Sequence, residues 1–176
     1  MSDTQLTFKS PLKTLEGLSF LTASLLGVLF HFVYDWSNEN FFTGLFFPVN
    51  ESTWEHLKLV FLPILIVSVL EYFIGGIQRQ DFPCIKLRSA LLGMLIIVVL
   101  FYTYTGVLGT TIDWLNIVIY FIGMGVAYLY SYRRLNAESP SNCSPHLSLL
   151  LTFFLLILFM VFTVYPPGLG LFSAPL

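Results

Sequence analysis

Five long apolar stretches constrain the fold of this chain more than any other feature. Each is close to the roughly 20 residues that an α-helix needs to cross the hydrocarbon core of a bilayer. The stretches cover residues 17–36, 54–75, 87–108, 113–132 and 147–165. Because a segment in lipid must satisfy its own backbone hydrogen bonds, they predict an all-α, polytopic transmembrane helix bundle with five spans.

The composition supports this class. Hydrophobic residues make up 56% of the chain, charged residues only 10%, and the mean hydropathy is +0.81. A soluble domain carries about 25% charged residues. With a net charge of -2 and no basic tract, we expect no nucleic-acid partner. The chain has no internal repeat, so residues 1–176 are expected to form a single integral membrane domain whose main partner is the lipid bilayer.

The positions of the basic residues predict the orientation. All but one of the eight lysines and arginines precede the first span, flank the second connection or follow the fourth span. These seven are Lys9, Lys13, Arg79, Lys86, Arg88, Arg133 and Arg134, with only Lys58 on the other side. The positive-inside rule therefore places the N-terminus inside and the C-terminus outside. Trp36, Trp54 and Trp114 all fall at the predicted outer interface, where indole rings concentrate.

The connection between the first two spans is itself apolar. Residues 41–49 are rich in phenylalanine, but the segment is too short to cross and is interrupted by Gly44 and Pro48. We expect a short interfacial or re-entrant segment on the outer side.

Small residues one helical turn apart predict where helices approach closely. Ser89 and Gly93 form one such pair, and Gly123 and Ala127 form another. This spacing is typical of packing faces in membrane helices.

The two cysteines are expected to be free thiols. Cys84 and Cys143 form no CxxC motif and fall on the predicted cytoplasmic side, where thiols stay reduced. The sequence therefore predicts neither a disulfide nor a structural zinc site.

Ionisable residues gather at the predicted outer end. Asp35 lies one turn beyond His31 on the first span, and Asp113 opens the fourth. The second span begins with further candidates for catalysis, so that the whole candidate set is His31, Asp35, Glu51, Glu55 and His56. Ionisable groups in a membrane are costly and often functional. Imidazole and carboxylate groups suit zinc or another divalent transition metal, for which the predicted ligands are His31, Asp35, Glu55 and His56.

Two other interpretations of these residues stay open. In a metal-free site, a carboxylate or a histidine would act as general acid or base. In a purely structural reading, Ser52 and Glu55 form a capping box and Lys58 pairs with Glu55 three residues earlier. Glu71, near the predicted inner end of the second span, is expected to reach the inner interface or to meet Arg79, Lys86 or Arg88.

One segment resembles a known family. The block Pro48-Val49-Asn50-Glu51-Ser52-Thr53-Trp54-Glu55-His56-Leu57-Lys58-Leu59, preceded by His31-Phe32-Val33-Tyr34-Asp35-Trp36, is similar to an uncharacterised family of bacterial polytopic membrane proteins. The resemblance extends over nearly the whole chain and implies a bacterial plasma-membrane protein of unknown function. Members commonly carry an acidic residue soon after the Leu171-Phe172 pair, where this chain has Ser173 and Ala174.

Three classes of function are compatible with the sequence. The chain has no Gly-rich phosphate loop, HExxH, GxSxG or Ser-x-x-Lys motif. The leading hypothesis is a membrane-embedded enzyme or binding protein for a lipid-like substrate or small-molecule ligand, with its polar site facing the outer leaflet. The alternatives are a transport component for a small solute or ion, and a non-catalytic scaffold that works in an oligomer or with a partner subunit.

Overall fold

The computed structural model describes residues 6–75, 77, 79–140 and 142–174, with side chains from residue 12 onward. Within this part of the chain the order is α1 Leu6–Trp36, α2 Phe41–Gly44, α3 Thr53–Phe73, α4 Phe82–Leu108, α5 Asp113–Leu135, α6 Pro145–Val164 and a 3-10 turn, η1, at Gly170–Phe172. No strand occurs among the described residues. The prediction of an all-α fold is confirmed.

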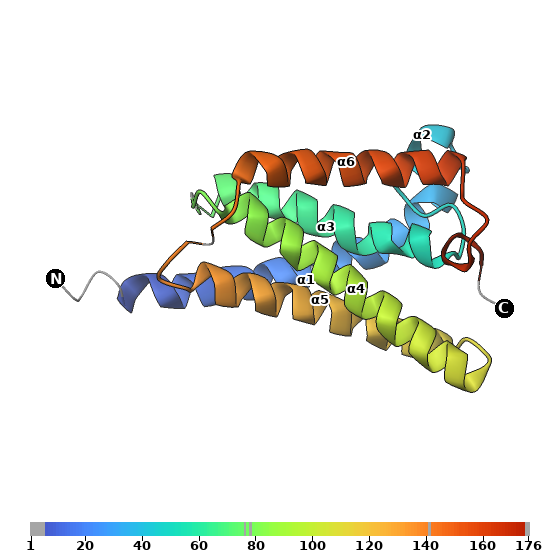
Figure 1. Ribbon diagram of the computed structural model, residues 1–176, viewed down its shortest axis with the longest axis horizontal. Coiled ribbons are helices and arrows are strands. Elements are labelled where there is room, and N and C mark those ends of the chain that lie inside the picture. The colour runs from blue at the N-terminus through green and yellow to red at the C-terminus, as the bar shows by residue number, and fades with distance from the viewer. Residues whose placement is uncertain (1–5, 76, 78, 141, 175–176) are drawn as a thin grey trace.

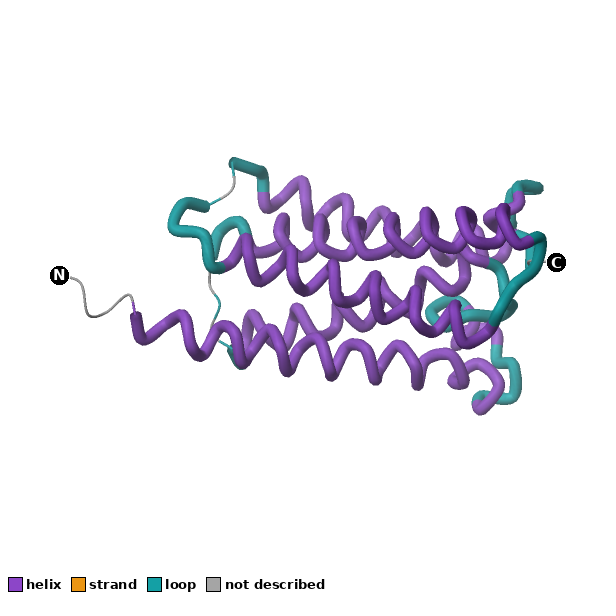
Figure 2. The backbone as a smooth tube through the Cα atoms, turned by 90° about the horizontal axis from the view of Figure 1, so that it is seen from below, coloured by secondary structure: helices purple, strands orange, loops and turns teal. Residues whose placement is uncertain are grey.

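Five of these helices are long and apolar enough to cross a membrane: α1 from Leu12, and α3, α4, α5 and α6 over their whole lengths. The chain is therefore a multi-pass membrane protein, as the sequence predicted. The long helices run along one another, with the connections at the two ends of the bundle (Figures 1 and 2). The four-residue helix α2 occupies the connection for which a short outer segment was expected.

Helix ends follow local sequence signals. Ser52 accepts a hydrogen bond from the Glu55 amide and begins α3, as the predicted cap requires. Pro83 lies in the first turn of α4, where a proline costs no hydrogen bond, so this helix begins five residues before the predicted apolar stretch. At the other end of α4, Gly109 adopts φ 71° and donates to the Thr105 carbonyl, a conformation that favours glycine.

α3 is the central helix. In its most apolar window 61% of the residues are buried, against 11–33% in the other four spans. Its Val60 and Phe61 pack with Met94 of α4, Met124 of α5 and Phe159 of α6 in the main apolar cluster. Large apolar side chains on the outside, such as Phe73, are exposed because lipid rather than water surrounds a spanning helix.

The predicted packing faces meet between α4 and α5. Ser89 donates to the Ala127 carbonyl at 2.7 Å. A Cβ atom built at Gly93 would lie 3.0 Å from the Ala127 Cβ and 3.0 Å from the Gly123 carbonyl oxygen. The two small-residue pairs therefore face each other, which confirms their predicted role in close helix approach.

The expectation of free thiols is wrong. Cys84 and Cys143 form a disulfide, with 6.6 Å between their Cα atoms. Although 59 residues separate them in sequence, the bundle places the first turn of α4 beside the connection that leads to α6. The bond ties these two helices together at the end of the bundle opposite His31.

We predict that Gly123→Ala destabilises the bundle. Its new Cβ would lie 2.5 Å from Ile97 Cγ1 and 2.9 Å from the Gly93 carbonyl oxygen, and such overpacking costs about 1–3 kcal/mol. Gly125→Ala is the matched control on the same helix, because nothing lies within 4 Å of its Cβ position. Thermal unfolding in detergent should show a lower midpoint for Gly123→Ala only. Equal midpoints for the two variants would contradict this account.

Candidate functional site

Three of the predicted candidates meet at one end of the bundle. His31 lies near the end of α1, Glu51 directly precedes the Ser52 cap, and His56 lies in the first turns of α3. One ligand atom from each lies within 4.8 Å of the others. His56 Nε2 is 3.3 Å from Glu51 Oε2, and the two imidazole rings are 5.2 Å apart.

The start of α3 explains why Glu51 and His56 meet. In a capped helix, the residue before the cap and the fourth helical residue lie close together, a position often filled by an apolar pair. Here Glu51 and His56 occupy these positions, so the cap at Ser52 brings their side chains together. His31 joins them from α1, which packs beside α3.

Hydrogen bonding fixes the orientation of the His56 ring. Its Nδ1 lies 3.0 Å from the Ser52 carbonyl oxygen, which can only accept, so Nδ1 carries the proton. Nε2 is therefore directed toward Glu51 and His31. Histidines that bind metals are commonly oriented by such a bond from the second ring nitrogen.

The hydrogen bond to His56 is the main cause that lowers the pKa of the Glu51 carboxyl below its ordinary value. The electrostatic influence of His56 and His31 lowers it further, while partial burial opposes the shift. Glu51 is therefore an anion at neutral pH, the form in which a carboxylate binds a metal or accepts a proton.

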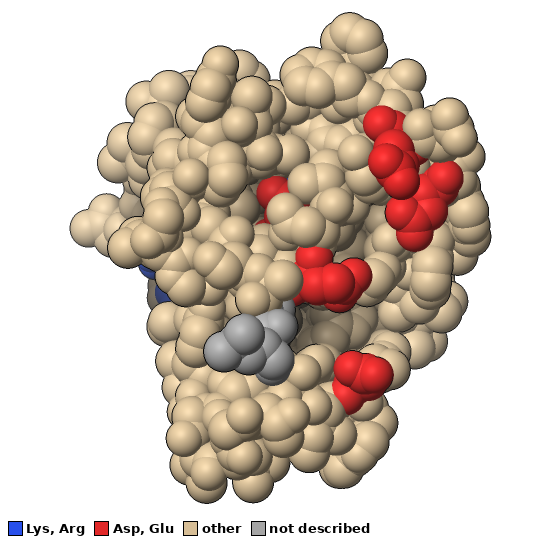
Figure 3. Space-filling view, turned by 90° about the vertical axis from the view of Figure 1, so that its right-hand side faces the viewer, with Lys and Arg blue, Asp and Glu red and all other residues tan. Residues whose placement is uncertain are grey.

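These residues line a cavity of about 650 Å³ between α1, α3, α4 and α5. Its other polar lining residues are Thr53, Thr111, Asp113, Asn116 and Tyr120. Acidic side chains gather at this end of the molecule (Figure 3). A cavity of this size accommodates a small ligand or the polar headgroup of a lipid.

Asn116 and Tyr120 also line this cavity and were not predicted as site residues. A signal for them was present, because Asp113, Asn116 and Tyr120 follow one another at spacings of three and four, which places them on one face of a helix. Asn116 accepts a short hydrogen bond from the Tyr104 hydroxyl, and Tyr120 donates to the Ser24 carbonyl at 3.0 Å. α5 therefore supplies one polar wall of the cavity.

The structure does not bring Asp35 and Glu55 into this group. Asp35 is exposed, one turn beyond His31. Glu55 is 2% exposed and its carboxylate accepts hydrogen bonds from the Val49 amide, Lys58 and Thr163, at 3.1, 2.7 and 2.8 Å. The predicted pairing of Glu55 with Lys58 is confirmed.

Lys58 completes this second network. It is 1% exposed and also donates to the Gly44 carbonyl at 3.0 Å and to Thr163 at 2.6 Å. The Glu55–Lys58 pair therefore holds α2 and the end of α6 against the first turns of α3.

We predict that Lys58→Met strongly destabilises the protein. The substitution leaves the Glu55 carboxylate buried without a cation, which costs about 3–5 kcal/mol. The free energy of unfolding, measured by denaturant titration in mixed micelles, should fall by this amount. The double variant Glu55→Gln with Lys58→Met removes both charges and should recover much of the loss. An unchanged stability of the single variant would show that the pair does not hold this end together.

Comparisons with known proteins identify a family and leave the activity open. Neither a search of curated proteins nor a search of solved structures found a match. A family model, described as a family of unknown function (DUF6512), matches residues 9–176. The match covers nearly the whole chain, including all three residues of the His31, Glu51 and His56 group, and the chain therefore belongs to this family of unknown function.

Proposed function

We propose that this protein holds a metal ion within the membrane and uses it to bind, or to act on, a lipid-like substrate from the outer leaflet. The observation that carries the proposal is the meeting of two imidazoles and one carboxylate, from His31, His56 and Glu51, on the wall of the 650 Å³ cavity. Two histidines and a glutamate are a known ligand set of catalytic zinc, with one coordination position left for water or substrate.

The spacing of the three ligand atoms suits a single ion. Zinc binds nitrogen and oxygen at about 2.0–2.2 Å, so its tetrahedral ligands lie roughly 3.3 Å from one another. The ligand atoms are now up to 4.8 Å apart. Small side-chain rotations would shorten these separations to the value that zinc requires. An ion there would polarise a phosphoryl or carbonyl oxygen of the substrate, or lower the pKa of a bound water.

The depth of the site supports a lipid-like substrate. His31 is five residues from the end of α1, or roughly 7 Å along the helix axis. With the end of α1 at the membrane surface, this depth corresponds to the boundary between headgroups and acyl chains, because each headgroup layer is about 5–8 Å thick. Apolar residues such as Phe32, Ile97 and Phe101 line the same cavity as the polar group.

A metal-free acid–base site is the second candidate. The observation that favours it is the direct contact between His56 Nε2 and Glu51 Oε2, at 3.3 Å. Because Nδ1 is bonded to the Ser52 carbonyl, the proton would be held between Nε2 and Glu51, and either group could exchange it with a substrate in the cavity.

Metal content separates the two candidates. We predict near-stoichiometric zinc or another transition metal in detergent-purified protein prepared without chelators, measured by mass spectrometry. His31→Ala and His56→Ala should each lose the ion, because two ligands hold it weakly. Asp35→Asn is the matched control and should keep it, because Asp35 lies outside the group. If the folded wild type contained no metal, the metal-site proposal would be wrong and the metal-free acid–base site would remain as the candidate.

We further propose that the cavity end faces outward. All lysines and arginines except Lys58 lie toward the opposite end, and Lys58 is neutralised by Glu55. Trp36 and Trp114 are exposed at the cavity end, as expected at an interface. The disulfide favours the reverse orientation, because cytoplasmic thiols are kept reduced. Burial of Cys84, which is 1% exposed, limits access of cytoplasmic reductants to the bond.

Labelling of single added cysteines tests the orientation. Thr110 and Ser139 are exposed in the connections at opposite ends of the bundle, and the native cysteines are paired. On intact cells, a membrane-impermeant maleimide should label Thr110→Cys and not Ser139→Cys. After lysis both should react. Labelling of Ser139→Cys alone on intact cells would place the cavity in the cytoplasmic leaflet and exclude an outer-leaflet substrate.

A further inference from the structure

A second ionisable cluster lies toward the other end of the bundle, away from the metal-site residues. Lys86 of α4 donates to Glu16 Oε1 of α1 at 2.8 Å and forms a short ion pair with Glu71 of α3. The three side chains are only 5%, 3% and 2% exposed. Helices from three parts of the chain therefore bring two carboxylates to one ammonium group inside the bundle.

The charges of this cluster do not balance when all three groups are ionised. Two carboxylates and one ammonium carry a net charge of -1, and a buried charge without compensation costs several kcal/mol. Two acids that share one site also resist ionising together. One bound proton makes the cluster neutral.

The hydrogen bonding points to the same missing proton. Glu71 Oε1 is buried and has no hydrogen-bond partner. The hydroxyls of Tyr128 and Ser131, from α5, are buried beside the cluster. Ser131 is a hydrogen-bond donor toward Glu16, and Tyr128 interacts electrostatically with both carboxylates. Ionised carboxylates can only accept, so a proton on one of them adds a donor beside an oxygen atom that lacks one.

The surroundings indicate which group stays charged. Lys86 Nζ lies 5.5 Å from the centre of the Phe82 ring and 5.3 Å from that of Tyr128, and aromatic faces stabilise a cation. Tyr120 acts electrostatically on Tyr128, and its hydroxyl donates to the Ser24 carbonyl. The exchangeable proton therefore belongs to the carboxyl pair.

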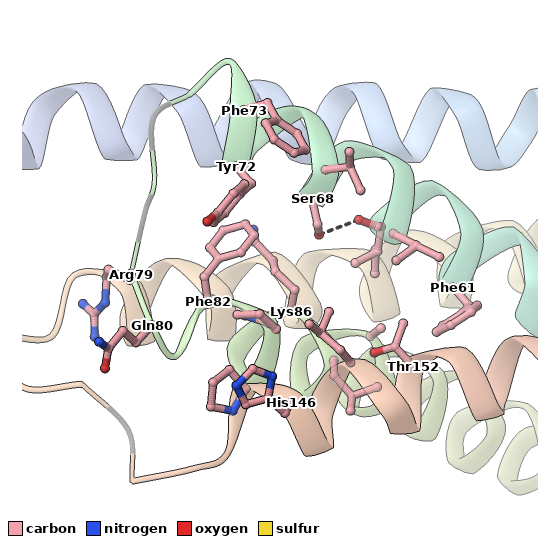
Figure 4. A pocket seen from close by; sticks show the side chains of 18 residues that line it. Phe61, Ser68, Tyr72, Phe73, Arg79, Gln80, Phe82, Lys86, His146 and Thr152 are labelled. Atoms are coloured by element: carbon pink, nitrogen blue, oxygen red, sulfur yellow. Dashed lines mark hydrogen bonds between the residues drawn. The ribbon is translucent and has the colours of Figure 1, made fainter.

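A cleft lies beside this cluster, toward the end of the bundle opposite His31. It has a volume of about 770 Å³ and lies between α3, α4 and α6, where Lys86 lines it together with Tyr72, Phe82 and His146 (Figure 4). His146 is exposed at its border. Lys86 is thus the member of the cluster that faces this cleft, with Glu16 and Glu71 bonded to it.

We propose that Glu16, Glu71 and Lys86 form a buried proton-binding site, in which two carboxylates share one ammonium group and one transferable proton. The O–H bond of one carboxylic acid breaks as that of the other forms, while Lys86 stays an ammonium ion. Release of the proton to water leaves the cluster at -1, and its uptake restores neutrality. This proposal does not depend on the metal site.

Infrared spectroscopy of the detergent-purified protein tests the proposal. Wild type at neutral pH should show the C=O stretching band of a protonated carboxylic acid, shifted by exchange into D₂O. Glu16→Gln and Glu71→Gln should each remove it, because the remaining carboxylate then pairs with Lys86 alone. Glu39→Gln, an exposed position at the other end of the bundle, should retain it. A folded wild type without the band, or a band that persists in both cluster variants, would overturn the proposal.

Two further measurements keep the test decisive if one variant folds poorly. Lys86→Met should increase the band about twofold, because without the ammonium both carboxyls take protons. An unchanged band there would contradict the shared proton. Replacing choline chloride with sodium chloride should leave the wild-type band unchanged. Loss of the band in sodium would show that a metal cation, rather than a proton, balances the cluster.

Discussion

The buried pair between Glu55 and Lys58 is the interaction on which the cavity end of this protein depends. It fixes the first turns of the central helix α3 to the Gly44 carbonyl and to Thr163 of α6. Burying two charges is costly unless their remaining hydrogen bonds are satisfied, and here each side chain makes three. Because α3 is held in this way, Glu51 and His56 on either side of its cap have defined positions.

Much of the fold could be predicted because it follows from the bilayer. The five spans, the Ser52 cap, the pairing of Glu55 with Lys58 and the small-residue faces of α4 and α5 each depend on residues close in sequence or on a general property of lipid. The disulfide could not be predicted from the sequence, because it depends on how α4 and α6 are placed relative to each other. The expectation of free thiols rested on the reducing conditions of the cytoplasm, and these do not determine whether two cysteines lie close enough to pair.

The candidate site was only partly predictable for the same reason. Helical spacing correctly places Asp35 one turn from His31, but it does not say which of the two faces α3. Glu51 and Glu55 are four residues apart across a helix cap, and the chain direction changes between them. One carboxylate therefore points toward the histidines, whereas the other points toward Lys58 and α6. Only the packing of α1 on α3 distinguishes a ligand from a structural anion.

The protein uses the same residue types in three different ways along α3 and its neighbours. Glu55 has one cation and full hydrogen bonding, which is a structural arrangement. Glu71 shares its cation with Glu16 and leaves its Oε1 without a partner, which is an incomplete arrangement that the proposed proton would complete. Glu51 is largely exposed to a cavity and faces two imidazoles, which is an arrangement open to a ligand. Burial alone would rank Glu55 first, whereas the balance of charges and hydrogen bonds is the reason that we propose Glu51 and Glu71 as the functional carboxylates.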